Sequence, residues 1–130
     1  MMQWQVERDS EHGFLVVRTS GRFDTASHRR MIEDIVTQTF WRPGTDVLFD
    51  HRAIDFGDSG IEQMRAAESN HAAFDERIGD GRAAILMDGA ASFGLGRQFT
   101  LLAEDEVAAH MRVFTDEEAA VQWLMRSSTR

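Results

Sequence analysis

The sequence predicts a single α/β domain with a mixed, mostly parallel five-stranded sheet and four helices, in the order β-β-α-β-α-β-α-β-α. Short apolar runs alternate along the chain with longer segments of helical periodicity, which is typical of strands joined by helical crossovers. The loop Asp9–Gly13 separates the first two runs and indicates a hairpin. A chain of 130 residues has the length of one domain, which we place at residues 1–126 with a tail at 127–130.

The strands are predicted from short apolar or β-branched runs that are bounded by turn residues. The first two runs form an antiparallel pair across the hairpin. Each later run is followed by a helical segment, so those strands are expected to be parallel and joined by right-handed crossovers. The predicted strands are Trp4–Glu7, Gly13–Thr19, Asp46–Asp50, Arg82–Met87 and Met111–Phe114.

The helices are predicted from apolar residues that recur every three or four positions. Met31 and Ile35 mark the apolar face of the first helix, and His71 lies on the apolar stripe of the second, where we expect a hydrogen-bonded core residue. Phe99 marks the face of the third helix, and Trp123 is expected to anchor the last one in the core. The predicted helices are Thr25–Trp41, Ser59–Arg77, Ser92–Glu106 and Thr115–Met125.

Composition excludes several classes of function. The chain has no cysteine, which excludes disulfides, thiolate metal sites and a cysteine nucleophile. All 14 basic residues are arginines, so lysine Schiff-base chemistry is excluded as well. The formal net charge is −8 without an arginine-rich segment, and such a field repels the phosphates of nucleic acids. The longest apolar run, Ala83–Met87, is too short to insert across a membrane, and the N-terminus does not resemble a signal peptide, so a cytoplasmic location is expected.

The stretch Asp55–Gly60, DFGDSG, invites three interpretations. Its first three letters match the metal-binding motif of protein kinases, but a kinase also needs a strand lysine, which this chain lacks. Ser59 and Glu62 have the spacing of a helix capping box, and Asp58 would add charge at the positive end of the helix dipole. The third interpretation is a partner-binding or switch turn formed by Asp55, Asp58, Ser59 and Gly60.

A second glycine-rich stretch, Ser92–Arg97, could form an anion- or ligand-binding turn at a helix start, with Gly94 and Gly96 supplying backbone amides and Arg97 a charge. The simpler interpretation is a strand-to-helix turn with Arg97 in solvent. As a dinucleotide fingerprint the stretch lacks the third glycine. We therefore expect no nucleotide or other cofactor.

The five histidines do not show the sequence spacing of metal ligands. His51, next to Asp50, resembles a functional residue most closely. A triad of His51, Ser59 and an aspartate is conceivable, but GDSG is not the strand-turn-helix motif of serine hydrolases. We therefore expect neither a metal site nor catalytic residues, and we expect a protein that is not an enzyme.

Two stretches resemble the STAS domains of the SpoIIAA-like family, the fold of anti-sigma-factor antagonists. FLVVRTSGRFDTASHRRMIEDI is similar to the strand, T-G-x-L-D pattern and first helix of that family, with Ser20–Asp24 at the pattern. VLFDHRAIDFGDSGIEQM is similar to the third strand and the D-S-[ST]-G turn that follows it. The segments Gly94–Arg97 and Val113–Leu124 resemble a poorly characterised bacterial STAS/SEC14-like branch.

The resemblance implies a non-enzymatic regulator that binds a protein partner and is switched by phosphorylation of the first serine in the turn. Aligned without a gap, Asp58 takes the place of that serine, and Ser59 takes the place of the second hydroxyl residue. A one-residue slip would make Ser59 the acceptor. In the gapless alignment the charge is permanent and no switch is expected.

Two functions follow from the sequence. The first is a regulatory protein-interaction module that uses the turn at Asp55–Ile61 and the helix after it, and its small sheet is compatible with a homodimer. The second is a small-molecule or lipid-binding module with a cavity between helices and sheet, lined by residues such as Met64, Phe93 and Phe99.

Overall fold

The computed structural model describes residues 1–127, so the predicted tail at 127–130 lies outside the described residues except for residue 127. The five strands form one sheet in sequence order, with β1 antiparallel to β2 and all other neighbours parallel. The strands are β1 (Met2–Arg8), β2 (Leu15–Arg22), β3 (Val47–Asp55), β4 (Arg82–Leu86) and β5 (His110–Phe114). The predicted mixed sheet is therefore confirmed.

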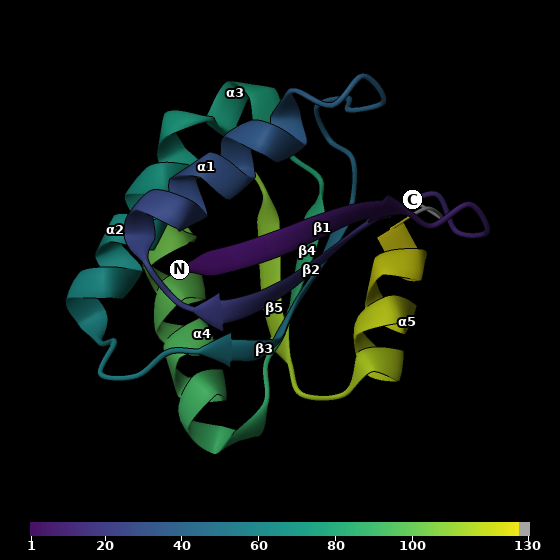
Figure 1. The fold of residues 1–130 in the computed structure, drawn as a ribbon. Helices are drawn as coiled ribbons and strands as arrows, with labels where there is room; N and C mark the ends of the chain where they lie inside the picture. Colours follow the sequence, from purple (N-terminus) through teal and green to yellow (C-terminus); the bar gives the residue numbers. More distant parts are fainter. Residues whose placement is uncertain (128–130) are drawn as a thin grey trace.

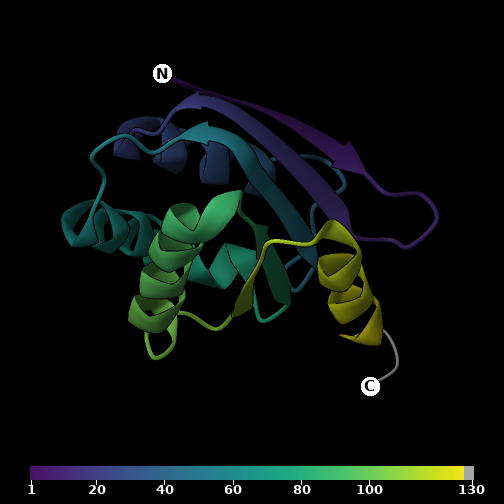
Figure 2. The same ribbon diagram turned by 90° about the horizontal axis from the view of Figure 1, so that it is seen from below.

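Helices cover the two faces of the sheet unequally. α1, α2 and α4 lie on one face, whereas α5 packs alone on β3, β4 and β5 from the other (Figures 1 and 2). The helices are α1 (Thr25–Val36), α2 (Ile61–Ala73), α3 (Asp75–Ile78), α4 (Gly89–Ala103) and α5 (Glu117–Ser127). The predicted second helix divides at Phe74 into α2 and the four-residue α3, which accounts for five helices rather than four.

Each face of the sheet has its own hydrophobic core. The larger core packs under α1, α2 and α4, and it includes the fully buried Val17 and Met31. The smaller core lies under α5 and centres on Leu48, Leu86 and Leu124. Both faces of the central strands are therefore buried, which is why β4 reads as a continuous apolar run rather than an alternating one.

Two helix ends differ from the prediction. α1 stops at Val36 with Thr37 as its C-cap, and the predicted extension to Trp41 is a turn. The Trp41 indole donates a hydrogen bond to the carbonyl oxygen of Arg77 at 2.7 Å, so this turn serves to pin α1 against the end of α3. α5 begins at Glu117 rather than Thr115, because the side chain of Asp116 accepts the free N–H of Ala119 at 3.1 Å.

A longer β3 is the most consequential difference from the prediction. The strand continues five residues past Asp50 to Asp55, and its pairing with β2 shifts register: Arg18 pairs with Asp50, whereas Ser20 pairs with Ala53. Three steps along β3 therefore match two along β2, which defines a β-bulge. The bulge changes the side-chain alternation within β3 at this point.

Gly96 allows α4 to pack closely on the sheet. A methyl group at Gly96 would lie 2.7 Å from Cγ2 of Val113, whereas one at Gly94 would meet no atom within 4 Å. We expect Gly96→Ala to destabilise the fold by about 1–3 kcal/mol through overpacking. The matched control Gly94→Ala is expected to stabilise it by about 0.5–1 kcal/mol through helix propensity. Urea unfolding measures the change in unfolding free energy for each variant. Equal changes in the two variants would contradict the close packing at Gly96.

Candidate functional site

The predicted site turn connects β3 to α2 and is held by hydrogen bonds between its own residues. The amide of Gly57 donates to Asp55 Oδ1 at 2.9 Å, and the amide of Ser59 donates to the carbonyl oxygen of Phe56 at 2.9 Å. Gly57 has a φ of 52°, in the left-handed region that glycine tolerates best. The turn therefore brings together the four residues singled out in the sequence, Asp55, Asp58, Ser59 and Gly60.

The predicted capping box is displaced by one residue. The N-cap of α2 is Gly60, and its amide donates to Gln63 Oε1 at 2.7 Å, so Gln63 takes the role expected of Glu62. Within residues 1–127 the hydroxyl of Ser59 has no hydrogen-bond partner, so it is not the cap. The structural role assigned to Ser59 in the sequence is wrong, and its side chain is free for another role.

The turn presents acidic groups and one apolar side chain. Asp55, Gly57 and Asp58 are exposed, and Ser59 and Gly60 are half-buried. Ile61, the first residue of α2, is a large aliphatic side chain that is 42% exposed. The turn is thus an accessible feature of the surface and not part of the core.

Phe56 faces inward from the same turn. Its ring lies 5.4 Å from that of Phe23, and both rings line a cavity of about 40 Å³ between the sheet and the helices α1, α2 and α4. The second function considered from the sequence requires a cavity in this place, and of the lining residues named for it Met64 and Phe99 are present whereas Phe93 is not. The cavity is lined by Met2, Phe23, His28, Met31, Phe49, His51, Ile54, Phe56, Met64, Ala67, His71, Ile85, Met87 and Phe99.

Three histidines from three different elements line this cavity, which we call the histidine cavity. His28 comes from α1, His51 from β3 and His71 from α2. The His28 and His71 rings are 5.3 Å apart, and His71 lies 5.2 Å from the Phe99 ring. His28 and His71 are only 5% exposed. Among residues 1–127 no three His, Asp or Glu side chains gather as metal ligands do.

Hydrogen bonds fix two of the three rings. Nδ1 of His28 lies 3.1 Å from the amide nitrogen of Asn70, and Nδ1 of His51 lies 2.7 Å from the hydroxyl of Thr19. Nδ1 of His71 is buried without any partner. The expectation that His71 is a hydrogen-bonded core residue is therefore wrong, because its position is buried but its nitrogen is unsatisfied. His51 bonds Thr19 rather than Ser59, so the conceivable triad does not form.

Burial keeps all three rings neutral near pH 7. It lowers the pKa of His71 to about 4, with a further contribution from His51. It also lowers the pKa of His51 to about 4, although the Asp50 carboxylate acts in the opposite direction. The pKa of His28 falls well below its usual value through burial and through the proximity of His71 and His51. The cavity is therefore an uncharged site with polar atoms.

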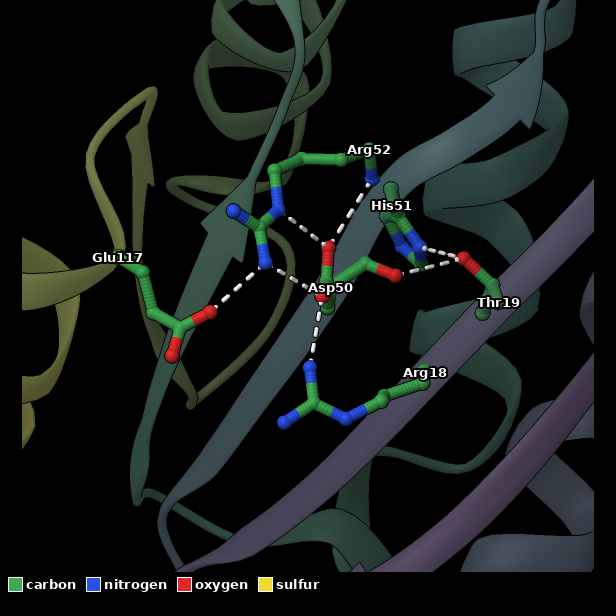
Figure 3. Close-up of polar contacts among 6 residues, drawn as sticks. All are labelled: Arg18, Thr19, Asp50, His51, Arg52 and Glu117. Atoms are coloured by element: carbon green, nitrogen blue, oxygen red, sulfur yellow. Dashed lines mark hydrogen bonds and ion pairs between the residues drawn. The ribbon is translucent and has the colours of Figure 1, made fainter.

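On the opposite face of the sheet, Asp50 is the centre of an ionic network that reaches α5 (Figure 3). Its carboxylate accepts from Arg18 Nη1 at 2.8 Å and from Arg52 Nε and Nη2 at 3.0 and 2.9 Å. Arg52 also pairs with Glu117 at 2.7 Å. Hydrogen bonds from the Arg52 side chain hold the pKa of Asp50 below its usual value, against the effect of burial.

The predicted ligand turn at Gly94, Gly96 and Arg97 is not a turn. These residues lie inside α4, which starts at Gly89, three residues before the predicted start at Ser92. Their backbone N–H groups lie beyond the free amides of the first helical turn, so they cannot form an anion cradle. Gly96 serves close packing instead, and Arg97 is exposed.

Sequence reasoning missed His28 and the partnerless state of His71. The three histidines are separated by 23 and 20 positions, and only the fold brings them together. The one available signal was the position of His28 and His71 on the apolar faces of α1 and α2, where polar residues are rare.

We expect the stability to fall steeply as the pH drops from about 6.5 toward 4. In this window His28, His51 and His71 bind protons in the unfolded chain while burial keeps them neutral in the folded chain, so each of these three removes about 1.4 kcal/mol per pH unit. His71→Phe should reduce the slope of the unfolding free energy against pH by about one third of the histidine contribution. Urea unfolding between pH 4.5 and 7.5 measures this slope. The exposed His110 provides the control His110→Gln, and an equal slope in both variants would contradict the assignment.

We expect Asp50→Asn to destabilise the fold by about 1–3 kcal/mol, because two half-exposed arginines lose their common charged acceptor. Glu117→Gln should cost less than about 1 kcal/mol, because this pair is largely solvated. Thermal and urea unfolding at pH 7 compare the two variants. A larger effect of the Glu117 variant would place the centre of the network at α5 rather than at Asp50.

Comparisons with known proteins bear on the fold. No model of a protein family matches the chain, and no curated protein matches it in sequence. Among solved structures, it is similar to an uncharacterised protein of the DUF3478 family with a SpoIIAA-like fold from Shewanella loihica PV-4. The two are 17% identical with a TM-score of 0.60, and the match covers 95% of this chain and 93% of the other. Together with the strand order and the covering helices, this similarity shows that the chain has the SpoIIAA-like α/β fold.

Proposed function

We propose that this protein is a regulatory domain that binds a protein partner through the turn at Asp55–Gly60 and the first turn of α2. The observation that supports the proposal best is the exposed Ile61, which stands directly after the turn at the start of α2. An apolar side chain on the surface anchors an interface when it fills a pocket of the partner and becomes desolvated there.

The surroundings of Ile61 suggest the chemistry of the partner. Asp55, Asp58 and Glu62 are exposed next to it in the chain, so the anchor has an acidic rim. A matching surface would offer a small apolar pocket with arginine or lysine at its edge. The overall formal charge of −8 favours the same kind of partner and disfavours nucleic acid.

We propose that the negative charge of this surface is permanent rather than switched. Asp58 is exposed and stands where the resemblance places the phosphorylated serine. The alternative alignment, shifted by one residue, makes Ser59 the phosphate acceptor. Ser59 is half-buried, and its hydroxyl has no partner in the part of the chain that the structure describes. A phosphate-affinity gel of the protein from its native host distinguishes a permanent charge at Asp58 from a switch at Ser59. Only a switch at Ser59 gives a phosphorylated form that is lost in the variant Ser59→Ala.

A binding role agrees better with the site than catalysis does. Activation of a serine requires a base within hydrogen-bond reach. His51 instead bonds Thr19 at 2.7 Å, and within residues 1–127 Ser59 has no base beside it. Among those residues no helix is long and apolar enough to cross a membrane.

A second candidate function is the binding of a small molecule in the histidine cavity. The observation in its favour is the buried Nδ1 of His71, which lacks a partner in a cavity of about 40 Å³. Buried polar atoms are satisfied in the great majority of cases, so an unsatisfied one at a cavity supports a binding site there. The volume favours a compact molecule over a whole lipid.

The partner proposal is tested by changing the anchor and the charge of the turn. We expect Ile61→Asp and Asp58→Arg to reduce recovery of a specific partner from the native host at least tenfold, measured by affinity purification with quantitative mass spectrometry. The control Glu106→Arg reverses an exposed charge after the far end of α4 and should leave recovery unchanged. A partner that is retained by both turn variants would overturn the proposal.

A further inference from the structure

The hydrogen bonds around His28 determine which of its nitrogens carries the proton. The side-chain amide nitrogen of Asn70 donates to the carbonyl oxygen of Thr25 at 3.0 Å and lies 3.1 Å from Nδ1 of His28. An amide nitrogen only donates, so Nδ1 of His28 must accept. The neutral ring of His28 therefore carries its proton on Nε2, which is an N–H donor.

The opposite tautomer follows for His51. The hydroxyl of Thr19 donates its single proton to the carbonyl oxygen of Asp50 at 2.9 Å. Its 2.7 Å contact with Nδ1 of His51 is therefore made by an N–H of the histidine that donates to the hydroxyl oxygen. This leaves Nε2 of His51 as an acceptor. Figure 3 shows the Thr19 hydroxyl joined by dashed lines to both the His51 ring and the Asp50 carbonyl oxygen.

The histidine cavity consequently has one free donor and one free acceptor. In the described residues no protein group pairs with Nε2 of His28 or Nε2 of His51, and the nearby Nδ1 of His71 is buried without a partner. An unsatisfied buried polar atom costs free energy, whereas a ligand or water that pairs with it recovers this cost. His71 also lines a second cavity of about 30 Å³, so the space around its side chain is incompletely filled.

The lining selects against a charged ligand. It contains no Asp, Glu, Lys or Arg, and the nearest carboxylate, that of Asp50, is engaged by Arg18 and Arg52 on the other face of the sheet. An ammonium group or a carboxylate would enter without a counter-ion, which carries a large desolvation cost. A hydroxyl group suits the site, because one oxygen both donates and accepts a hydrogen bond.

We propose that the histidine cavity binds a compact, uncharged molecule through one hydroxyl group, for which Nε2–H of His28 is an available donor, Nε2 of His51 an available acceptor and the partnerless Nδ1 of His71 a further nitrogen. The proposal rests on the second candidate function and names its ligand class. An apolar cavity of about 150 Å³ holds benzene, so about 40 Å³ fits a group of only a few heavy atoms. Of the lining residues only Phe23, His51 and Phe56 are half-exposed, so the rest of the molecule leaves the cavity beside the two phenylalanines.

The test compares three probes of similar size by NMR of protein labelled with ¹⁵N-histidine at pH 7.5. 1-Propanol carries the hydroxyl, methyl ethyl ether only accepts, and propylammonium is charged. We expect saturable shifts of Nε2 of both His28 and His51 with 1-propanol, and at least tenfold weaker binding of the other two probes because a hydrogen bond is lost or a charge is buried. The spectrum without probe should show a proton on Nε2 of His28 and on Nδ1 of His51.

Variants locate the site. His28→Phe and His51→Phe should weaken 1-propanol binding about tenfold, whereas the exposed control His110→Gln should leave it unchanged. If a cavity variant does not fold, Thr19→Val serves instead, because it removes the hydroxyl that fixes the His51 tautomer. Equal binding of propanol and ether, or shifts that grow without saturation because the cavity holds only water, would overturn the proposal. Neither result bears on the partner test, since Ile61 and Asp58 do not line the cavity.

Discussion

The bulge in β3 is the constraint on which both faces of the site depend. In a regular strand, residues 51 and 54 would point to opposite faces. The extra residue between Asp50 and Ala53 brings His51 and Ile54 to the same cavity and leaves Arg52 on the side of α5. Asp50 holds this irregularity, because its Oδ1 accepts both the backbone N–H and the side-chain Nε of Arg52. The ionic network therefore contributes to the geometry of β3 as well as to stability, because the Asp50 carboxylate is largely buried although its two arginines are half-exposed.

The polar groups on the two faces of the sheet differ in charge and in hydrogen-bond partners. Under α5, the Asp50 carboxylate has two arginine partners. Under α1, α2 and α4, three histidines are held neutral in an apolar space, and one of their nitrogens has no partner. A core selected for stability alone would have apolar side chains at these positions and no cavity. Natural proteins depart from such local rules mainly at functional sites, so the histidine cavity is the part of this core that stability does not explain.

The sequence predicted the order of elements because hydrophobic periodicity is local, and it predicted the turn at Asp55–Gly60 from its composition. The bulge could not be predicted, because the exposed Arg52 and Ala53 break the alternation of β3 and resemble the start of a loop. The cap at Ser59 was misplaced by one residue and the last helix was expected to begin at Thr115, two residues early, since neighbouring polar residues satisfy the same pattern and only the backbone decides between them. α4 was expected to begin late because Gly89 and the alanines after it carry no periodic signal.

Phe56 makes the surface turn and the histidine cavity parts of one structure. Its backbone carbonyl accepts the amide of Ser59 in the turn, while its ring packs on Phe23 and lines the cavity. A molecule that enters beside Phe56 would contact that ring, and the residues attached to it are those proposed to meet a partner. Coupling between two binding sites is reciprocal. If a ligand in the cavity alters the position of Phe56 and thereby changes the affinity for the partner, then the partner changes the affinity for the ligand by the same factor. The two proposed functions are therefore compatible in one molecule, and Phe56 is the residue through which one would influence the other.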